Sequence, residues 1–221
     1  MTEIRKSDLA NASGVIFDCD GTLLDTLDAW RRVEEPLFAQ IPFMLSQTQE
    51  DEIHSAPIEE AARIFHEKYG VGESGEAVLA HLDNGLLSFY RDKANALPGA
   101  VSLVRQLVER KIPCVVVSSS PRRYLEAGLG RAGILDCFKE LISTEDLGVS
   151  KQNPAIYQHA LDVMGSRKES TWAFDDAAYA CEVMTDFGLI TVSPTNDDGV
   201  KVAQPVSRAT FVVSTLEEML L

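Results

Sequence analysis

Two aspartates, separated by one residue, follow the first apolar run of the sequence. In "GVIFDCDGTLLDT" (residues 14–26), Asp18 and Asp20 come directly after the β-prone segment Val15–Phe17 and directly before Gly21. Alternate side chains of an extended chain point to the same side, so both carboxylates can face one site. Because carboxylates that close repel each other, the pattern predicts a cation or a shared proton between them. Capping of a loop is the alternative for Asp18 and Asp20 taken alone.

Other polar groups end later apolar segments. These are Ser118, Ser119 and Ser120 in "VVVSSS", Lys151 in "SKQNP", and Asp175 and Asp176 in "WAFDD". Taken singly, each has an ordinary explanation: a strand-end hydrogen bond, a solvated surface lysine, or a pair of helix N-caps. Ligands of open α/β sheets bind beyond the carboxyl ends of the strands, where all these groups would meet.

Alternating strands and helices must position these polar residues. Short apolar, β-branched runs predict buried parallel strands, and amphipathic or Pro-started segments predict helices between them. Strand and helix in alternation imply an α/β fold, a doubly wound parallel sheet with both faces covered. The predicted strands are 14–18, 112–118, 140–144, 171–175, 189–193 and 209–214, and the predicted helices are 99–111, 121–134 and 153–165.

Residues 27–92 interrupt this alternation. They contain no β-branched run and three helical patterns, which predicts an all-helical inserted domain. We therefore expect an α/β core domain of residues 1–26 and 93–221 and a helical domain of residues 27–92. The insert has 13 acidic and 5 basic residues, a formal charge of −8. Its Arg31 and Arg32 either reach a substrate or pair with neighbouring glutamates.

Composition limits the possible partners and the location. The chain of 221 residues is 45% hydrophobic, with a formal net charge of −14. This charge disfavours nucleic acid and anionic membranes as partners. The four cysteines form no C-x-x-C pair, and the N-terminus has no apolar signal core. We expect a soluble, cytoplasmic protein. Its oligomeric state cannot be read from the sequence.

The motifs in order resemble those of one known family. "DCDGTLLDT" is similar to the first signature, D-x-D-G-T-L-x-D, of the haloacid dehalogenase-like (HAD) hydrolase superfamily. Ser118 matches its second motif, Lys151 its third, and Asp175 with Asp176 its fourth. The insert resembles the helical C1 cap of the phosphatase and β-phosphoglucomutase branch. The resemblance implies a Rossmann-like core with an inserted cap.

The resemblance also implies a mechanism and a cofactor. Asp18 would attack a phosphoryl group to form an aspartyl-phosphate, and Asp20 would act as general acid and then as general base. Lys151 would supply fixed positive charge, and Ser118 and Ser119 would bind phosphate oxygens. Mg²⁺ would be held by the Asp18 carboxylate, the Asp20 backbone carbonyl and the Asp176 carboxylate, with Asp175 acting directly or through water. Arg122 and Arg123 either help to hold phosphate or lie on a helix surface.

Three functions stay open at this point. The expected one is Mg²⁺-dependent hydrolysis of a small phosphorylated metabolite, and the first alternative is a sugar phosphomutase. The second alternative is a non-catalytic protein that binds a phosphorylated ligand. It rests on a departure from the family pattern, since Ala177 and Ala180 stand where relatives often have Ser and Gly. Dehalogenation is disfavoured, because relatives with that activity lack the second aspartate.

Overall fold

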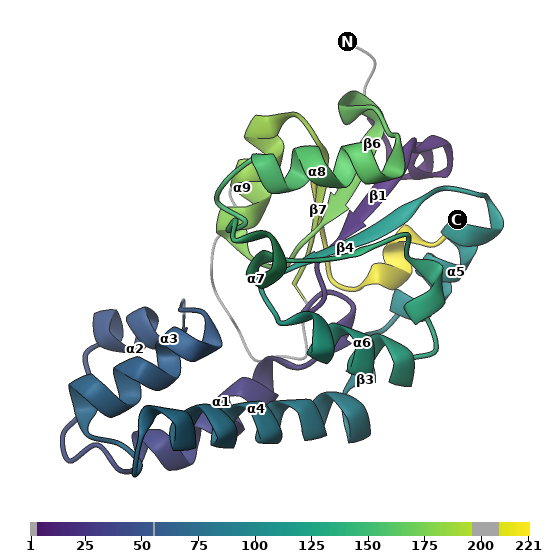
Figure 1. The fold of residues 1–221 in the computed structure, drawn as a ribbon. Coiled ribbons are helices and arrows are strands. Elements are labelled where there is room, and N and C mark those ends of the chain that lie inside the picture. Colours follow the sequence, from purple (N-terminus) through teal and green to yellow (C-terminus); the bar gives the residue numbers. More distant parts are fainter. Residues whose placement is uncertain (1–3, 55, 196–207) are drawn as a thin grey trace. The chain divides into compact units, whose positions relative to one another are not determined.

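The structure, a computed structural model, describes residues 4–54, 56–195 and 208–221. It divides into two compact units (Figure 1). One consists of Met1–Asp25 together with Ala94–Leu221, and the other of Thr26–Lys93. Within the described residues, no helix is both long and apolar enough to cross a bilayer.

A parallel sheet forms the centre of the first unit and confirms the predicted fold class. Among the described residues it has six strands, in the order β5-β4-β1-β6-β7-β8, and every neighbouring pair is parallel. The strand order reverses direction at β1, as in doubly wound folds. The strands are β1 (Gly14–Phe17), β4 (Cys114–Ser118), β5 (Leu141–Ser143), β6 (Thr171–Phe174), β7 (Ile190–Pro194) and β8 (Phe211–Val213).

Helices cover the two faces of this sheet (Figure 1). The helices α8 and α9 lie on one face, where Tyr157 and Met184 pack with Ile16, Val115 and Ala173 of the strands. The helices α5 and α6 lie on the other side in Figure 1. The bounds are α5 (Ala100–Glu109), α6 (Arg122–Arg131), α7 (Thr144–Leu147), α8 (Ala155–Met164) and α9 (Ala178–Phe187), with 3₁₀ helices at Lys6–Asn11, Leu135–Cys137, Lys168–Ser170 and Leu216–Met219.

Several elements of this unit were not predicted. A two-residue strand, β2 (Leu24–Asp25), pairs antiparallel with β3 (Asn95–Ala96), where the chain leaves and re-enters the unit. Two residues are too few to show any periodicity. Helix α9 follows the acidic pair Asp175–Asp176, and its amphipathic pattern is weak because small residues such as Ala180 face the core.

The second unit is helical over its described residues. It contains α1 (Leu27–Phe38), α2 (Gln47–His54), α3 (Ile58–Arg63), a π-helical turn (Ile64–Lys68) and α4 (Gly75–Asp92). The Ser74 hydroxyl caps α4 by accepting a 3.1 Å hydrogen bond from the Ala77 amide. A buried stripe of α4, made of Val78, Leu82, Leu86 and Tyr90, follows the spacing of an amphipathic helix. Helix α4 packs on α1 and α3.

Gly99 provides a sharp test of the packing in the first unit. It precedes α5 with φ +84°, and a Cβ atom there would lie 2.3 Å from the Glu217 amide nitrogen. Gly165, after α8, has φ +65° but no atom within 4 Å of such a Cβ. We expect Gly165→Ala to lower the free energy of unfolding by about 1 kcal/mol through backbone strain alone. Gly99→Ala should cost about 3 kcal/mol or more, because the 3₁₀ helix must also move.

Urea unfolding of the two variants and the wild type, followed by circular dichroism, measures this difference. Equal losses for Gly99→Ala and Gly165→Ala would contradict the close approach of the chain's last helix to Gly99.

Candidate active site

The candidate site lies at the carboxyl ends of three adjacent strands. Asp18 follows β1, Ser118 is the last residue of β4, and Asp175 follows β6. Because β4 and β6 flank β1, these residues meet where the strand order reverses. The backbone hydrogen bonds between β1 and β6 continue to Asp18, the nucleophile candidate, because its amide donates to the Phe174 carbonyl at 2.8 Å. The position of the Asp18 carboxylate is therefore set by sheet hydrogen bonds.

The Lys151 ammonium lies between two buried carboxylates. Its Nζ atom is 2.5 Å from Asp18 Oδ1 and 2.9 Å from Asp175 Oδ2. Lys151, Asp18 and Asp175 are only 4%, 5% and 2% exposed. The Tyr157 hydroxyl, from α8, donates to the Lys151 carbonyl at 3.0 Å and fixes the backbone that carries the lysine. Lys151 is therefore a buried part of an ion cluster, and the alternative of a solvated surface lysine is wrong.

Charges in this cluster are not balanced. Burial acts to lower the pKa of Lys151, but Asp175 and Asp18 outweigh it and raise that pKa above the ordinary lysine value. Burial raises the pKa of Asp18 well above its usual range, and Asp175, Asp176 and Asp20 add to this effect against the attraction of Lys151. One ammonium thus faces an excess of carboxylates, so the cluster favours a further positive charge.

Three of the carboxylates are close enough to share a cation. Ligand oxygens of Asp18, Asp175 and Asp176 all lie within 4.8 Å of one another. Asp176 is half-buried, and its amide donates to the Thr22 hydroxyl at 3.1 Å, which ties the loop after β6 to the loop after β1. Carboxylate oxygens in a negatively charged, partly buried cluster are suitable ligands for a divalent cation such as Mg²⁺.

Asp20 is held by two serines, Ser118 at the end of β4 and Ser120 in the loop after it. Its Oδ2 atom accepts a 2.6 Å hydrogen bond from the Ser120 hydroxyl and a 3.5 Å one from the Ser118 hydroxyl. The Ser118 hydroxyl also accepts a hydrogen bond from the Ser120 amide at 3.0 Å. Ser118 therefore satisfies a backbone group at the strand end and contacts Asp20 at the same time. Ser120 was not among the predicted site residues. Its only sequence signal was its place in the serine run.

The remaining serine of that run, Ser119, lies at the surface. It is exposed, whereas Ser118 and Ser120 are buried. Its carbonyl accepts from the Thr144 hydroxyl at 3.5 Å. Ser119 is thus adjacent to the acid cluster but not part of it.

The two departures from the family pattern leave the acids in place. The Ala177 amide donates to Asp175 Oδ1 at 2.9 Å, so Asp175 also orders the start of α9. Ala180 is fully buried in the core between α9 and the sheet. Cys19, between the two aspartates, is fully buried, and burial raises the pKa of its thiol well above the usual range. A thiol that is this buried and holds its proton this tightly is not a nucleophile candidate.

Arg122 and Arg123 do not join the acid cluster. The Arg122 guanidinium lies 2.7 Å from the Asp146 carboxylate, and that of Arg123 lies 3.7 Å from Glu145. Arg123 also stacks over the Tyr124 ring, 4.9 Å from its centroid. Both arginines therefore tie α6 to α7, which supports the helix-surface alternative.

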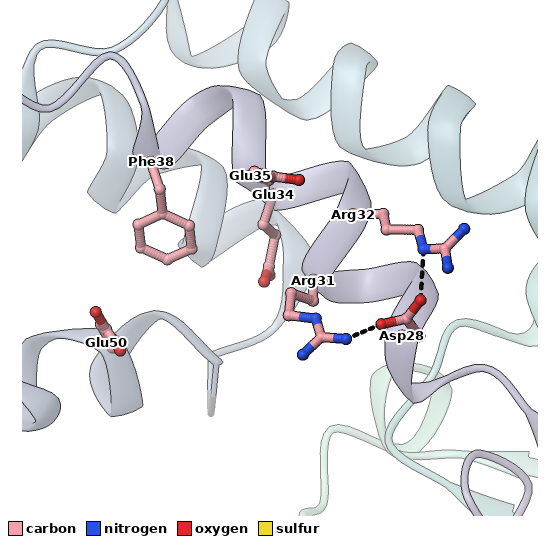
Figure 2. A pocket seen from close by; sticks show the side chains of 7 residues that line it. All are labelled: Asp28, Arg31, Arg32, Glu34, Glu35, Phe38 and Glu50. Carbon is pink, nitrogen blue, oxygen red and sulfur yellow. Dashed lines mark hydrogen bonds and ion pairs between the residues drawn. The ribbon is translucent and has the colours of Figure 1, made fainter. Parts of the chain in front are cut away.

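A pocket of about 510 Å³ lies within the helical unit (Figure 2). Arg31 and Arg32 both pair with Asp28, one turn earlier on α1, a partner that the sequence analysis did not name. The reason is geometric, since Asp28 is at the i−3 and i−4 positions, which face these arginines on a helix. The lining residues are Asp28, Arg31, Arg32, Glu34, Glu35, Phe38 and Glu50.

The acid cluster should make stability depend on pH when no metal is present. Burial, with the nearby Asp175, raises the pKa of Asp176 from the ordinary 3.8 to about 7. The folded protein therefore holds a proton that the unfolded chain has lost. This contribution to stability is complete below the unfolded pKa and disappears as pH rises through the folded one.

In EDTA, we expect the free energy of unfolding to fall by on the order of 2 kcal/mol between pH 5 and pH 8. Urea titrations at several pH values measure this slope. Asp176→Asn should reduce it, whereas Asp186→Asn, in the exposed pair with Arg208, should not. A metal-free protein that becomes more stable over this range would contradict the prediction.

Comparisons with known proteins agree with this geometry. The family model of the haloacid dehalogenase-like hydrolases matches residues 12–183. Validoxylamine A 7'-phosphate phosphatase of Streptomyces hygroscopicus subsp. limoneus is 24% identical over 92% of this chain and 94% of its own length. Hexitol phosphatase B of Escherichia coli (strain K12) is 26% identical over 73% of this chain and 74% of its own.

The fold is also found among solved structures. CbbY from Rhodobacter sphaeroides, solved in complex with phosphate, superimposes with a TM-score of 0.77 at 16% identity, over 94% of this chain and 96% of that one. Such a likeness concerns the fold alone, whereas the family model covers all four of Asp18, Ser118, Lys151 and Asp175. The chain belongs to the haloacid dehalogenase-like hydrolase family.

Proposed function

We propose that the chain is a Mg²⁺-dependent phosphatase that hydrolyses a small phosphorylated metabolite through an aspartyl-phosphate. One observation carries the proposal: Asp18, Lys151 and Asp175 form a buried ion cluster at the sheet edge, with Asp20 held beside it by two hydroxyls. This arrangement combines a nucleophile, a fixed cation and a proton donor. The two relatives named above are phosphatases, which supports the same reaction type.

In the first half of the reaction, an Asp18 carboxylate oxygen attacks phosphorus. The new bond joins Asp18 to the phosphoryl group, and the bond to the leaving oxygen breaks. Asp20 gives its proton to that oxygen, so the product leaves as a neutral alcohol. Ser120, which donates to Asp20 at 2.6 Å, holds this carboxyl group in place. Lys151 stabilises the charge on the nucleophile and the phosphoryl oxygens.

In the second half, water hydrolyses the aspartyl-phosphate. Asp20, now ionised, takes a proton from the attacking water, the bond between Asp18 and phosphorus breaks, and inorganic phosphate leaves. Both carboxylates return to their starting states, so the cycle balances. Ser118 and Ser119 are proposed to donate hydrogen bonds to the phosphate oxygens throughout.

Asp18, Asp175, Asp176 and the Asp20 backbone carbonyl would hold the Mg²⁺ ion. When bound, the ion supplies positive charge to the transferring phosphoryl group and relieves repulsion among the carboxylates. Its fit rests on the three carboxylates whose oxygens lie within 4.8 Å of one another.

A small substrate is favoured by charge and by resemblance. The helical unit, with its formal charge of −8 over residues 27–92, disfavours large polyanions. In this proposal it has the role of the family's cap, which excludes water and limits the size of the substrate. The named relatives, by their names, act on phosphorylated small molecules, which supports this class without fixing the compound.

The two alternatives receive less support. A phosphomutase would use the same residues but return the phosphoryl group to a sugar, and would release little inorganic phosphate. A non-catalytic role was based on Ala177 and Ala180, yet the acids, the lysine and their contacts are all present. Release of inorganic phosphate from a panel of phosphorylated metabolites with Mg²⁺ identifies the hydrolase. Conversion of a sugar phosphate to its isomer in the presence of a sugar bisphosphate separates the mutase from the non-catalytic protein.

Asp18→Asn tests the covalent mechanism. The amide is nearly isosteric with the carboxylate but is a poor nucleophile, so we expect kcat/KM to fall about 10³-fold or more. Phosphate release from an aryl phosphate measures the loss, and Asp186→Asn serves as the surface control. Substantial turnover by a verified Asp18→Asn preparation would exclude Asp18 as the nucleophile.

Removal of the metal tests the cofactor. EDTA should abolish turnover, and Mg²⁺ should restore it. Ca²⁺ should inhibit, because it accepts more ligands at longer distances and can engage both Asp18 oxygens. Phosphate release after dialysis into each ion provides the measurement. Undiminished activity in EDTA would contradict the roles given to Asp18 and Asp176.

A further inference from the structure

A fully buried serine lies one strand beyond the candidate active site. Ser143 is the last residue of β5, which lies beside β4 on the side away from β1. It pairs in register with Ser118, the last residue of β4. None of the residues given a role in the proposed reaction lies on β5, so that reaction does not by itself explain a buried hydroxyl at the end of this strand.

The Ser143 hydroxyl bonds two backbone groups. It donates to the Ser120 carbonyl at 2.9 Å, and it accepts from the Glu145 amide at 3.2 Å, where α7 begins. A hydroxyl has one proton to donate, so the proton goes to Ser120, and the cap of α7 uses a lone pair of the same oxygen. The cap serves the helix, whereas the bond to Ser120 reaches the residue that contacts Asp20.

The backbone of Ser120 is held on both sides of its Cα atom. Its amide donates to the Ser118 hydroxyl at 3.0 Å, and its carbonyl accepts from the Ser143 hydroxyl. Pro121 follows, and a residue before proline is largely restricted to extended backbone. Because the rotamer of a side chain depends on the backbone angles of its residue, these contacts also fix the direction of the Ser120 hydroxyl.

We propose that Ser143 is a positioning residue for Asp20, the proposed general acid, and acts through Ser120. The inference rests on the proposed function, because it concerns the proton transfer assigned to Asp20. The Ser120 hydroxyl lies 2.6 Å from Asp20 Oδ2, a contact that a small rotation of the Ser120 backbone would break. Both serines are buried, so little water competes for these hydrogen bonds. The relay extends from the end of β5, across the turn after β4, to the loop after β1.

A displaced general acid should affect different substrates unequally. An alkoxide leaving group needs a proton in the transition state, whereas p-nitrophenolate leaves readily without one. We therefore expect Ser143→Ala to lower kcat/KM for an alkyl phosphate about 3- to 10-fold, and that for p-nitrophenyl phosphate less than about twofold. The ratio kcat/KM reports the steps up to departure of the leaving group, which are those that use Asp20 as an acid. The dissociation constant of inorganic phosphate should change less than about twofold.

A double-mutant cycle tests whether Ser143 acts through Ser120. Ser143→Ala, Ser120→Ala and the double variant are compared with the wild type on both phosphates in Mg²⁺. Ser120→Ala should show the same selective loss, and adding Ser143→Ala to it should cause no further loss, because both changes act through one contact. Ser74→Ala, which removes the serine cap of α4, is the matched control for the lost cap of α7 and should leave the ratio between the two substrates unchanged. If the alanine variant does not fold, Ser143→Cys fills nearly the same space with a weak donor and should show the same selective loss.

A crystal structure of the Ser143→Ala variant adds a measurement that does not depend on activity. In it, the Ser120 hydroxyl should lose its 2.6 Å contact with Asp20 or occupy several rotamers. An unchanged contact, equal losses on the two phosphates, or additive losses in the cycle would overturn the positioning role. If the wild type releases no phosphate from any phosphomonoester, the proposed function fails, while the crystal structure still decides whether Ser143 positions Ser120.

Discussion

The buried contact of the Lys151 ammonium with Asp18 and Asp175 is the interaction on which the site depends. It brings one positive charge to the ends of two neighbouring strands, at 2.5 and 2.9 Å from their carboxylates. Removing one partner of a buried ion pair leaves an uncompensated charge, which costs far more than the pair itself contributes. The loops after β1 and β6 are therefore constrained by electrostatics as well as by the sheet.

One lysine does not neutralise all the carboxylates of the site, and neighbouring hydrogen bonds hold the remaining carboxylates in place. Two serine hydroxyls, at the end of β4 and in the loop after it, donate to Asp20, and the Thr22 hydroxyl accepts from the amide of Asp176. These bonds hold the carboxylates at the site in fixed positions. A site ordered in this way would need little rearrangement to bind the proposed metal ion and phosphoryl group.

The covering of the sheet explains why these charges remain buried. Helices α8 and α9 pack on one face through apolar and small side chains, including the fully buried Ala180. On the strands, the Phe17 and Phe174 rings stack with centroids 4.8 Å apart, directly before Asp18 and Asp175. The carboxylates thus end strands whose preceding residues are packed on the core, and low local polarity strengthens their contact with Lys151.

Much of the fold and of the candidate site was predictable from the sequence, because both depend on local patterns. Apolar, β-branched runs separated by helices implied a parallel sheet, and the polar residues that end those runs implied a shared edge. Asp18, Ser118, Lys151 and Asp175 were named in this way. The helical character of residues 27–92 followed from the same periodicity, although the exact bounds of its helices did not.

Only the tertiary structure decided which side chains meet. Ser120, rather than Ser119, donates the 2.6 Å hydrogen bond to Asp20, because the turn after β4 directs adjacent side chains differently. Lys151 reaches Asp18, which is 133 residues away in the sequence, and Arg31 and Arg32 both pair with Asp28. Sequence spacing determines which residues end a strand or share a helix face. The partner of a side chain beyond that element depends on strand order and packing, which join segments that are distant in sequence.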